Sequence, residues 1–134
     1  MSGARFVDAP ASPHGRAARI AVHATGAGPL AVLLHGYPLD HRMWDAVRHG
    51  ELAQRRKLAA IDLRGSSEVT AEEAAMKSAF AAAADETVLL IDSSKLGDRA
   101  LASALDWSQI DLLVTDLDVD DTRLDPYRPL VQIV

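Results

Sequence analysis

Polar side chains directly follow each of the apolar runs that read as buried strands. In open parallel sheets, ligands bind outside the carboxyl ends of the strands, so these are the residues whose types could do chemistry. Asp, Ser and Gly are also the usual residues of helix caps and turns, which is the alternative explanation. The residues that this pattern gathers on one expected rim are His35, Gly36, Asp62, Arg64, Gly65, Asp92, Ser93, Ser94, Lys95, Thr115 and Asp116.

Gly36 and Tyr37 suit the binding of an oxyanion. A glycine placed just after a strand lets the backbone turn sharply and direct N–H groups at a developing negative charge. His35 or His41 could approach a serine across the rim. However, no serine stands in a G-x-S-x-G pattern and no histidine follows His49, so we expect no catalytic residue and a protein that is not an enzyme.

A second group of polar residues, Asp92, Ser94, Lys95, Gly97 and Asp116, suits a small anionic ligand. A lysine and hydroxyl groups at a strand end fit a phosphate, whereas the neighbouring aspartates oppose it. The five histidines show no i,i+4 pairing backed by carboxylates, and the chain has no cysteine. We therefore expect no metal and no cofactor.

These residues must be positioned by alternating strands and helices. The apolar runs predict strands, and 3.6-residue periodicity with capping residues such as Asp40 and Thr70 predicts helices. A short edge strand at Phe6 and Val7 is also expected. The predicted strands cover 18–24, 30–34, 58–63, 87–91, 110–114 and 130–134, and the predicted helices cover 40–52, 71–84 and 96–107.

Alternation of this kind predicts an α/β fold. We expect a three-layer, mainly parallel sheet with helices on both faces, flavodoxin-like or Rossmann-like with strand order 2-1-3-4-5, entered through an N-terminal hairpin of strands 18–24 and 30–34. Residues 1–134 would form a single domain after a loose leader at 1–16. An open sheet edge could pair with another copy of the chain.

Composition restricts the partners. The chain has 134 residues and a net charge of −5, with +4 on residues 1–67 and −9 on residues 68–134. This acidic balance argues against binding nucleic acid. The sequence lacks an uninterrupted apolar run of the roughly 18 residues that cross a membrane and a secretory signal, so a cytoplasmic protein without membrane contact is expected.

The segment from about residue 6 to 67 resembles the N-terminal part of the α/β-hydrolase family. The resemblance rests on Leu33 to Trp44, with His-Gly after an early strand, and on Asp62 to Gly65, which matches the Asp-Leu-Arg-Gly ending of the next strand. In that family the residue after His-Gly contributes an oxyanion-hole N–H, a role that the resemblance implies for Tyr37.

The segment from about residue 71 to 134 resembles the C-terminal half of the effector-sensing domain of DeoR-type transcriptional repressors. Three motifs carry the resemblance: 75–80, 89–97 and 110–116. It implies a phosphorylated sugar or related metabolite as ligand, bound by Asp92, Ser94 and Lys95.

The sequence therefore predicts a chimera-like chain, with a hydrolase-like segment at 17–67 and a sensor-like segment at 68–134. The expected function is a non-catalytic domain related to a sugar-phosphate sensor of transcription regulation that lacks its DNA-binding part. The alternatives are a truncated α/β-hydrolase with weak esterase activity, and a structural or designed scaffold.

Overall fold

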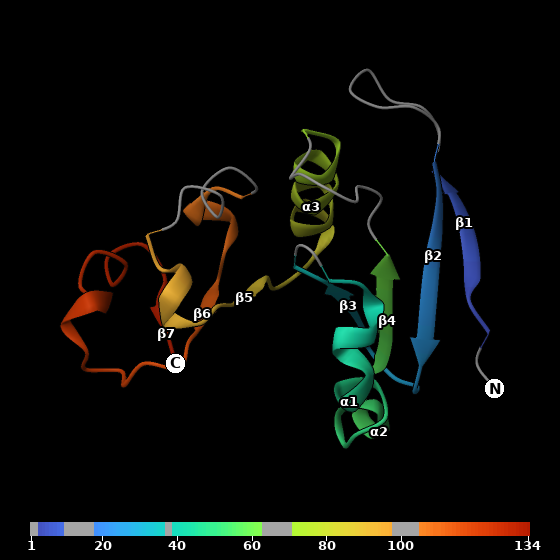
Figure 1. Cartoon of the computed structure of the whole chain (residues 1–134), viewed down its shortest axis with the longest axis horizontal. Helices are drawn as coiled ribbons and strands as arrows, with labels where there is room; N and C mark the ends of the chain where they lie inside the picture. Colours follow the sequence, from blue (N-terminus) through green and yellow to red (C-terminus); the bar gives the residue numbers. More distant parts are fainter. Residues whose placement is uncertain (1–2, 10–17, 37–38, 63–70, 98–104) are drawn as a thin grey trace. The chain divides into compact units, whose positions relative to one another are not determined.

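The computed structural model describes residues 3–9, 18–36, 39–62, 71–97 and 105–134 (Figure 1). The chain divides into two compact units, Met1–Glu73 and Ala74–Val134. A single sheet is expected from the sequence, whereas the structure has a separate sheet in each unit. Each unit is therefore described by itself.

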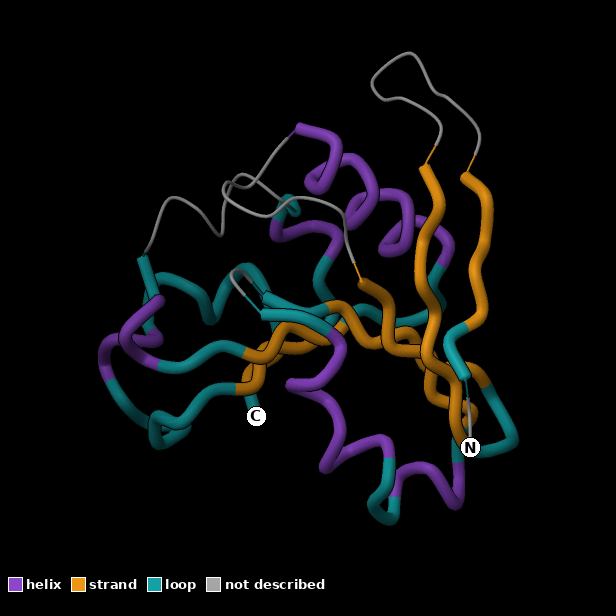
Figure 2. Tube along the Cα trace, turned by 45° about the vertical axis from the view of Figure 1, so that its right-hand side comes forward, coloured by secondary structure: helices purple, strands orange, loops and turns teal. Residues whose placement is uncertain are grey.

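The first unit is built on a four-stranded mixed sheet. Its strand order is β1-β2-β4-β3, with β2 antiparallel to both neighbours and β3 parallel to β4 (Figure 1). Strands are drawn in orange in Figure 2. The expected edge strand at Phe6 and Val7 is present as part of β1. The strands are β1 (Arg5–Ala9), β2 (Ala18–Thr25), β3 (Leu30–Leu34) and β4 (Lys57–Asp62).

β4 lies between β2 and β3, and this overturns the predicted hairpin of 18–24 with 30–34. The reason is burial: Leu58 and Ala60 of β4 are fully buried, whereas Leu30 of β3 is 60% exposed. The strand that is apolar on both faces takes the central position, because only there are both faces covered. The hairpin that does form joins β1 to β2.

The turn between β2 and β3 depends on glycine. Gly26 and Gly28 have φ values of +77° and +114°, which other residues rarely adopt. A side chain at Gly26 would also collide with the carbonyl oxygens of Ala53 and Arg56. The absence of a Cβ therefore lets this turn lie against the chain that leads into β4.

Three short helical segments replace the single helix predicted over 40–52. They are the 3₁₀ helix η1 (His41–Trp44), α1 (Asp45–Arg48) and α2 (Leu52–Arg55). Asp40 caps η1 as predicted, by accepting the N–H of Arg42. The helix breaks at Gly50, because glycine is a poor helix former. A Cβ at this position would lie 2.8 Å from the carbonyl oxygen of Ala46, so the break also favours glycine.

The second unit has a three-stranded parallel sheet of order β5-β6-β7. Its core is a cluster of Ile91, Ile110, Leu113 and Val131. Its strands are β5 (Val88–Leu90), β6 (Leu112–Val114) and β7 (Gln132–Ile133), and its 3₁₀ helices are η2 (Ser93–Lys95), η3 (Trp107–Gln109) and η4 (Thr122–Leu124).

The helix α3 (Ala71–Ala83) matches the predicted helix 71–84 and crosses the boundary between the units. The predicted cap Thr70, the centre of the predicted helix 96–107 and most of the leader lie outside the described residues. In the described ranges the α/β class holds with mixed strand directions, but a single three-layer sheet of order 2-1-3-4-5 is absent. None of the described helices has the length and apolar character that a membrane crossing requires.

Candidate functional site

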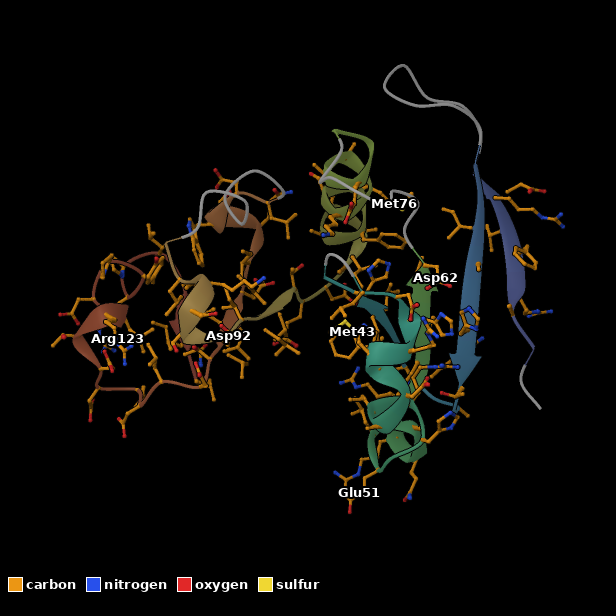
Figure 3. The ribbon with its side chains drawn as sticks, viewed as in Figure 1. Met43, Glu51, Asp62, Met76, Asp92 and Arg123 are labelled. Carbon is orange, nitrogen blue, oxygen red and sulfur yellow. The ribbon has the colours of Figure 1, made fainter. Side chains whose placement is uncertain are left out.

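Two histidines and an aspartate from three elements meet at the end of β4. The ring nitrogen Nδ1 of His41 lies 2.9 Å from both carboxylate oxygens of Asp62, and Nε2 of His23 lies 3.2 Å from Oδ2. The two imidazole rings stack with their centroids 3.5 Å apart and their planes within 7°. Asp62 is labelled in Figure 3. We call these three residues the His-Asp cluster.

The sheet register and a helix start position this cluster. β2 pairs with β4 so that Ala21 faces Asp62 and His23 faces Ala60. Residues two apart on a strand share a face, so His23 and Asp62 are diagonal neighbours on one side of the sheet. His41 opens η1, and its backbone N–H donates to Asp62 Oδ1 at 2.8 Å.

Asp62 is held ionised by its donors. Partial burial alone would raise the pKa of the Asp62 carboxyl, but hydrogen bonds from the backbone and ring of His41, with a further bond from His23, lower it below its usual value. The side chains of His23, His41 and Asp62 are 17%, 22% and 31% exposed. The cluster is thus a charged group on a partly covered surface, open to water and small molecules.

The predicted oxyanion-binding turn lies at the end of β3. His35 is buried, and its Nδ1 lies 3.2 Å from the carbonyl oxygen of Gly36. Leu39 donates its N–H to the same carbonyl at 2.8 Å, which joins the two ends of the loop. Gly36 is exposed, while Tyr37 lies outside the described residues. His35 is therefore poorly placed to act as a base, whereas His41 is held by a carboxylate.

In the second unit, the predicted ligand residues meet at the ends of β5 and β6. Asp92 caps η2 by accepting the N–H of Ser94 at 2.9 Å, and its carboxylate also accepts the Ser94 hydroxyl. Asp116 accepts the N–H of Ser93 at 2.6 Å. Hydrogen bonds from Ser94 lower the pKa of the Asp92 carboxyl. These carboxylates occupy N–H groups that a phosphate would otherwise use.

Lys95 and Gly97 lie beside these aspartates in sequence. Lys95 ends η2 and is exposed, and its charge helps to lower the pKa of Asp92. Gly97 has a φ of +84°, so its role in the fold is to turn the chain.

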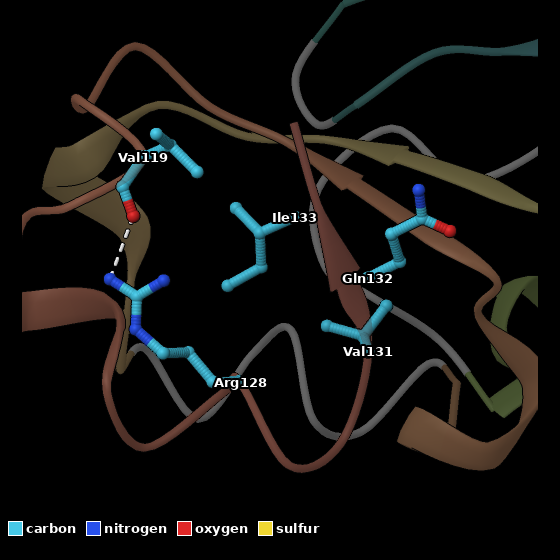
Figure 4. Close-up of a pocket in the computed structure, with 5 residues that line it drawn as sticks. All are labelled: Val119, Arg128, Val131, Gln132 and Ile133. Carbon is cyan, nitrogen blue, oxygen red and sulfur yellow. Dashed lines mark hydrogen bonds between the residues drawn. The ribbon is translucent and has the colours of Figure 1, made fainter.

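A shallow hollow also exists in the second unit (Figure 4). Arg128 crosses it and donates from Nη2 to the carbonyl oxygen of Val119 at 2.7 Å. The guanidinium is thus engaged by the protein itself. The lining residues are Val119, Arg128, Val131, Gln132 and Ile133.

Sequence reasoning placed Asp62 on the rim and considered His41, but it missed His23 and the pairing of both histidines with a carboxylate. Asp62 is 39 residues from His23 and 21 from His41, so no local spacing signals the contact. The sequence does show a histidine, His23, inside one predicted strand and a polar residue, Asp62, at the end of another. Their contact could be predicted only by knowing that these two strands pair antiparallel.

A model of the DeoR C-terminal sensor domain matches residues 57–117 of the chain. This confirms the sensor resemblance, and the match begins at β4, earlier than the predicted residue 71.

The chain is also similar to curated proteins of mycobacteria. It is 33% identical over 108 residues to "Probable oxidoreductase EphD" of Mycobacterium bovis, and equally to that protein of Mycobacterium tuberculosis. The match covers 79% of this chain and 17% of the relative, so the chain spans about a sixth of the length of these relatives. A match of that length extends beyond residue 67.

The chain is also similar, at low TM-scores, to solved structures. An epoxide hydrolase from an endophytic Streptomyces is 26% identical, with 98% of this chain and 35% of that chain covered and a TM-score of 0.40. The N-acyl homoserine lactonase AidH is 19% identical, with 84% and 44% covered and a TM-score of 0.49.

The expectation that the chain is not an enzyme is contradicted by the curated relatives. They carry the name of a probable oxidoreductase. The absence of a G-x-S-x-G pattern does not exclude catalysis, because this pattern is only one way to supply an attacking group.

Proposed function

We propose that the chain hydrolyses small activated esters, with the His41–Asp62 pair as general base and the turn after Gly36 as oxyanion site. One observation carries the proposal: Nδ1 of His41 lies 2.9 Å from both oxygens of a carboxylate that also accepts the backbone N–H of His41. A carboxylate that fixes one ring nitrogen in this way leaves the other to exchange a proton.

The reaction needs only water as the attacking group. Nε2 of His41 takes a proton as the water oxygen bonds to the ester carbonyl carbon, and the carbonyl oxygen becomes an oxyanion. The backbone N–H of Tyr37, to which the hydrolase resemblance gives this role, would stabilise that charge. When the carbon–oxygen bond to the alcohol breaks, the imidazolium returns its proton to the leaving oxygen. Asp62 stabilises the imidazolium during the interval between these transfers.

The test is turnover of p-nitrophenyl acetate by the full chain, with styrene oxide as a second substrate class. General-base catalysis contributes about 10²–10⁴-fold, so Asp62→Asn and His41→Gln should each lower kcat at least about 100-fold. Asp8→Asn and His49→Gln are matched controls, because both side chains are exposed and lie outside the cluster. A wild-type rate equal to that of buffer, or equal rates in Asp62→Asn and Asp8→Asn, would overturn the proposal.

A second candidate function, binding of a phosphorylated sugar as in effector sensing for transcription regulation, is favoured by the family-model match over 57–117. Lys95 would supply the positive charge, with Asp92, Ser94, Gly97 and Asp116 as its neighbours. The serine N–H groups are already bonded to carboxylates, so the ligand would have to displace them.

Thermal unfolding with glucose 6-phosphate and ribose 5-phosphate tests this candidate. A ligand at a hundred times its Kd stabilises the protein by about 2.7 kcal/mol. The shift should disappear in Lys95→Gln and persist in Lys57→Gln, which removes another exposed lysine. An unchanged Tm with both sugars would contradict it.

A further inference from the structure

The His-Asp cluster brings together atoms that metals prefer. Its ring nitrogens and carboxylate oxygen, one from each residue, lie within 4.8 Å of one another. In the part of the chain that the structure describes, this is where His and acidic ligand atoms gather closely enough to hold an ion. The three residues come from β2, η1 and β4, so the folded first unit preforms the group.

The donor set selects the class of ion. Two imidazoles and one carboxylate are a common ligand set for zinc, with the fourth position left to water. With bonds of about 2.0–2.1 Å, two nitrogens on a tetrahedral ion stand roughly 3.3 Å apart. The imidazole rings are stacked with planes within 7° of parallel, so both rings must rotate until their in-plane lone pairs converge on the ion. Magnesium and calcium prefer oxygen ligands, and this cluster offers a single carboxylate.

The carboxylate is already oriented for such a role. Asp62 Oδ1 accepts the backbone N–H of His41 at 2.8 Å, a bond that fixes the carboxylate from outside the ligand group. Partial exposure of all three side chains gives an ion and its water access from solvent.

We propose that His23, His41 and Asp62 form a binding site for one divalent transition-metal ion of the zinc class. The site goes beyond the proposed ester hydrolysis, in which Asp62 bonds directly to His41 without an ion. The ion takes Nδ1 of His41 and Nε2 of His23, and each neutral ring then carries its proton on the opposite nitrogen. Metal binding therefore removes the His41–Asp62 hydrogen bond and inhibits the hydrolysis.

The direct test is titration of the metal-free full chain with Co²⁺ and Zn²⁺. We expect one ion per chain by calorimetry, and visible absorption bands of Co²⁺ in a tetrahedral site that Zn²⁺ bleaches. His23→Gln and Asp62→Asn should each weaken binding at least tenfold, while His49→Gln and Asp8→Asn bind as the wild type does. Equal affinity in His23→Gln and His49→Gln would overturn the proposal, as would displacement of Co²⁺ by equimolar Mg²⁺.

A measurement on the unmodified chain covers the case in which a variant fails to fold. Paramagnetic Co²⁺ should shift the imidazole NMR signals of His23 and His41 strongly at one equivalent, and those of His49 much less. Uniform small shifts of all the histidines would mean surface binding and reject the site. When a chelator is added to the ester-hydrolysis assay and metal binding is measured without substrate, either proposal can fail while the other stands.

Discussion

The two units use aspartate in different ways at the ends of their strands. In the first unit, Asp62 binds side chains that lie 39 and 21 residues away. In the second unit, aspartates such as Asp92, Asp106 and Asp121 bond to an N–H two residues ahead and cap 3₁₀ helices. Asp40 forms the same kind of local cap in the first unit, so the units differ in Asp62, which joins two distant histidine side chains. The comparison teaches that position after a strand alone does not identify a functional carboxylate.

Asp111 and Asp116 are the instructive exceptions. Asp111 accepts the N–H of Thr87, 24 residues away, and Asp116 accepts the N–H of Ser93, 23 residues away, so the second unit also has long-range carboxylate contacts. These N–H donors belong to the backbone and stabilise the fold, whereas the partners of Asp62 include two ring nitrogens that can exchange protons or bind metal.

The largest effect should come from the centre of the first sheet. Leu58→Ala removes a fully buried side chain of β4 and should lower the free energy of unfolding by about 2–5 kcal/mol. The matched change Leu30→Ala on β3, where the side chain is 60% exposed, should cost much less. Urea unfolding of both variants measures the difference, and equal losses would contradict the central place of β4.

The next largest effect should come from replacing one glycine in each unit, Gly26 in the first and Gly97 in the second. Gly26→Ala forces a left-handed backbone on alanine, at roughly 1–2 kcal/mol, and adds a collision with two carbonyl oxygens. Gly97 in the second unit also has a positive φ, +84°. However, the Cβ added by Gly97→Ala would meet only the Tyr127 hydroxyl, at 3.8 Å. The first variant should therefore lose clearly more stability in urea than the second. The reverse order would show that the β2–β3 turn is loosely packed.

Replacing Asp62 and Asp92 tests whether the long-range carboxylate of the first unit stabilises the protein more than the local cap of the second. Asp62→Ala leaves a backbone N–H and two imidazoles without their acceptor and should destabilise by about 1–3 kcal/mol. Asp92→Ala opens only a local cap that water can replace, so its loss should be smaller. Thermal unfolding of the two variants measures the difference. Equal shifts of Tm would contradict the idea that Asp62 contributes more to stability than Asp92.

The smallest effect concerns acid titration in the second unit. The Arg123 guanidinium beside Asp121 lowers the pKa of that carboxyl to about 2. Because the folded-state pKa lies below the unfolded value, this contact stabilises the protein above about pH 4, and its contribution is lost as the pH falls toward 2. Arg123→Gln should return the pKa of Asp121 toward its usual range, measured by carboxyl ¹³C NMR. An unchanged titration would exclude Arg123 as the cause.

Local signals predicted the elements well. The strand predicted over 30–34 is β3 with the same bounds, and the helix predicted over 71–84 is α3. The Asp40 cap is also confirmed. These features depend on a few neighbouring residues, whose propensities and hydrogen bonds are readable in order along the chain.

The arrangement of elements was predicted less well, because strand pairing depends on burial between distant segments. Two strands at 18–24 and 30–34 separated by a glycine-rich turn are typical of a hairpin. Nothing in either segment signals that β4 lies between them in the sheet. The same pairing creates the contact between His23 and Asp62. The sequence therefore predicted only part of the candidate site. It identified Asp62 and His41 as candidates, but it did not predict His23 or the contacts among the three residues.

The shared carboxylate also fixes the direction of every hydrogen bond around it. An ionised Asp62 can only accept, so His23 must hold its proton on Nε2 and His41 on Nδ1 when both rings are neutral. Each ring is then left with a lone pair on its far nitrogen. A visiting molecule would accordingly meet acceptors rather than donors on these rings, which favours alcohols, ammonium groups and water over anions as neighbours of this surface.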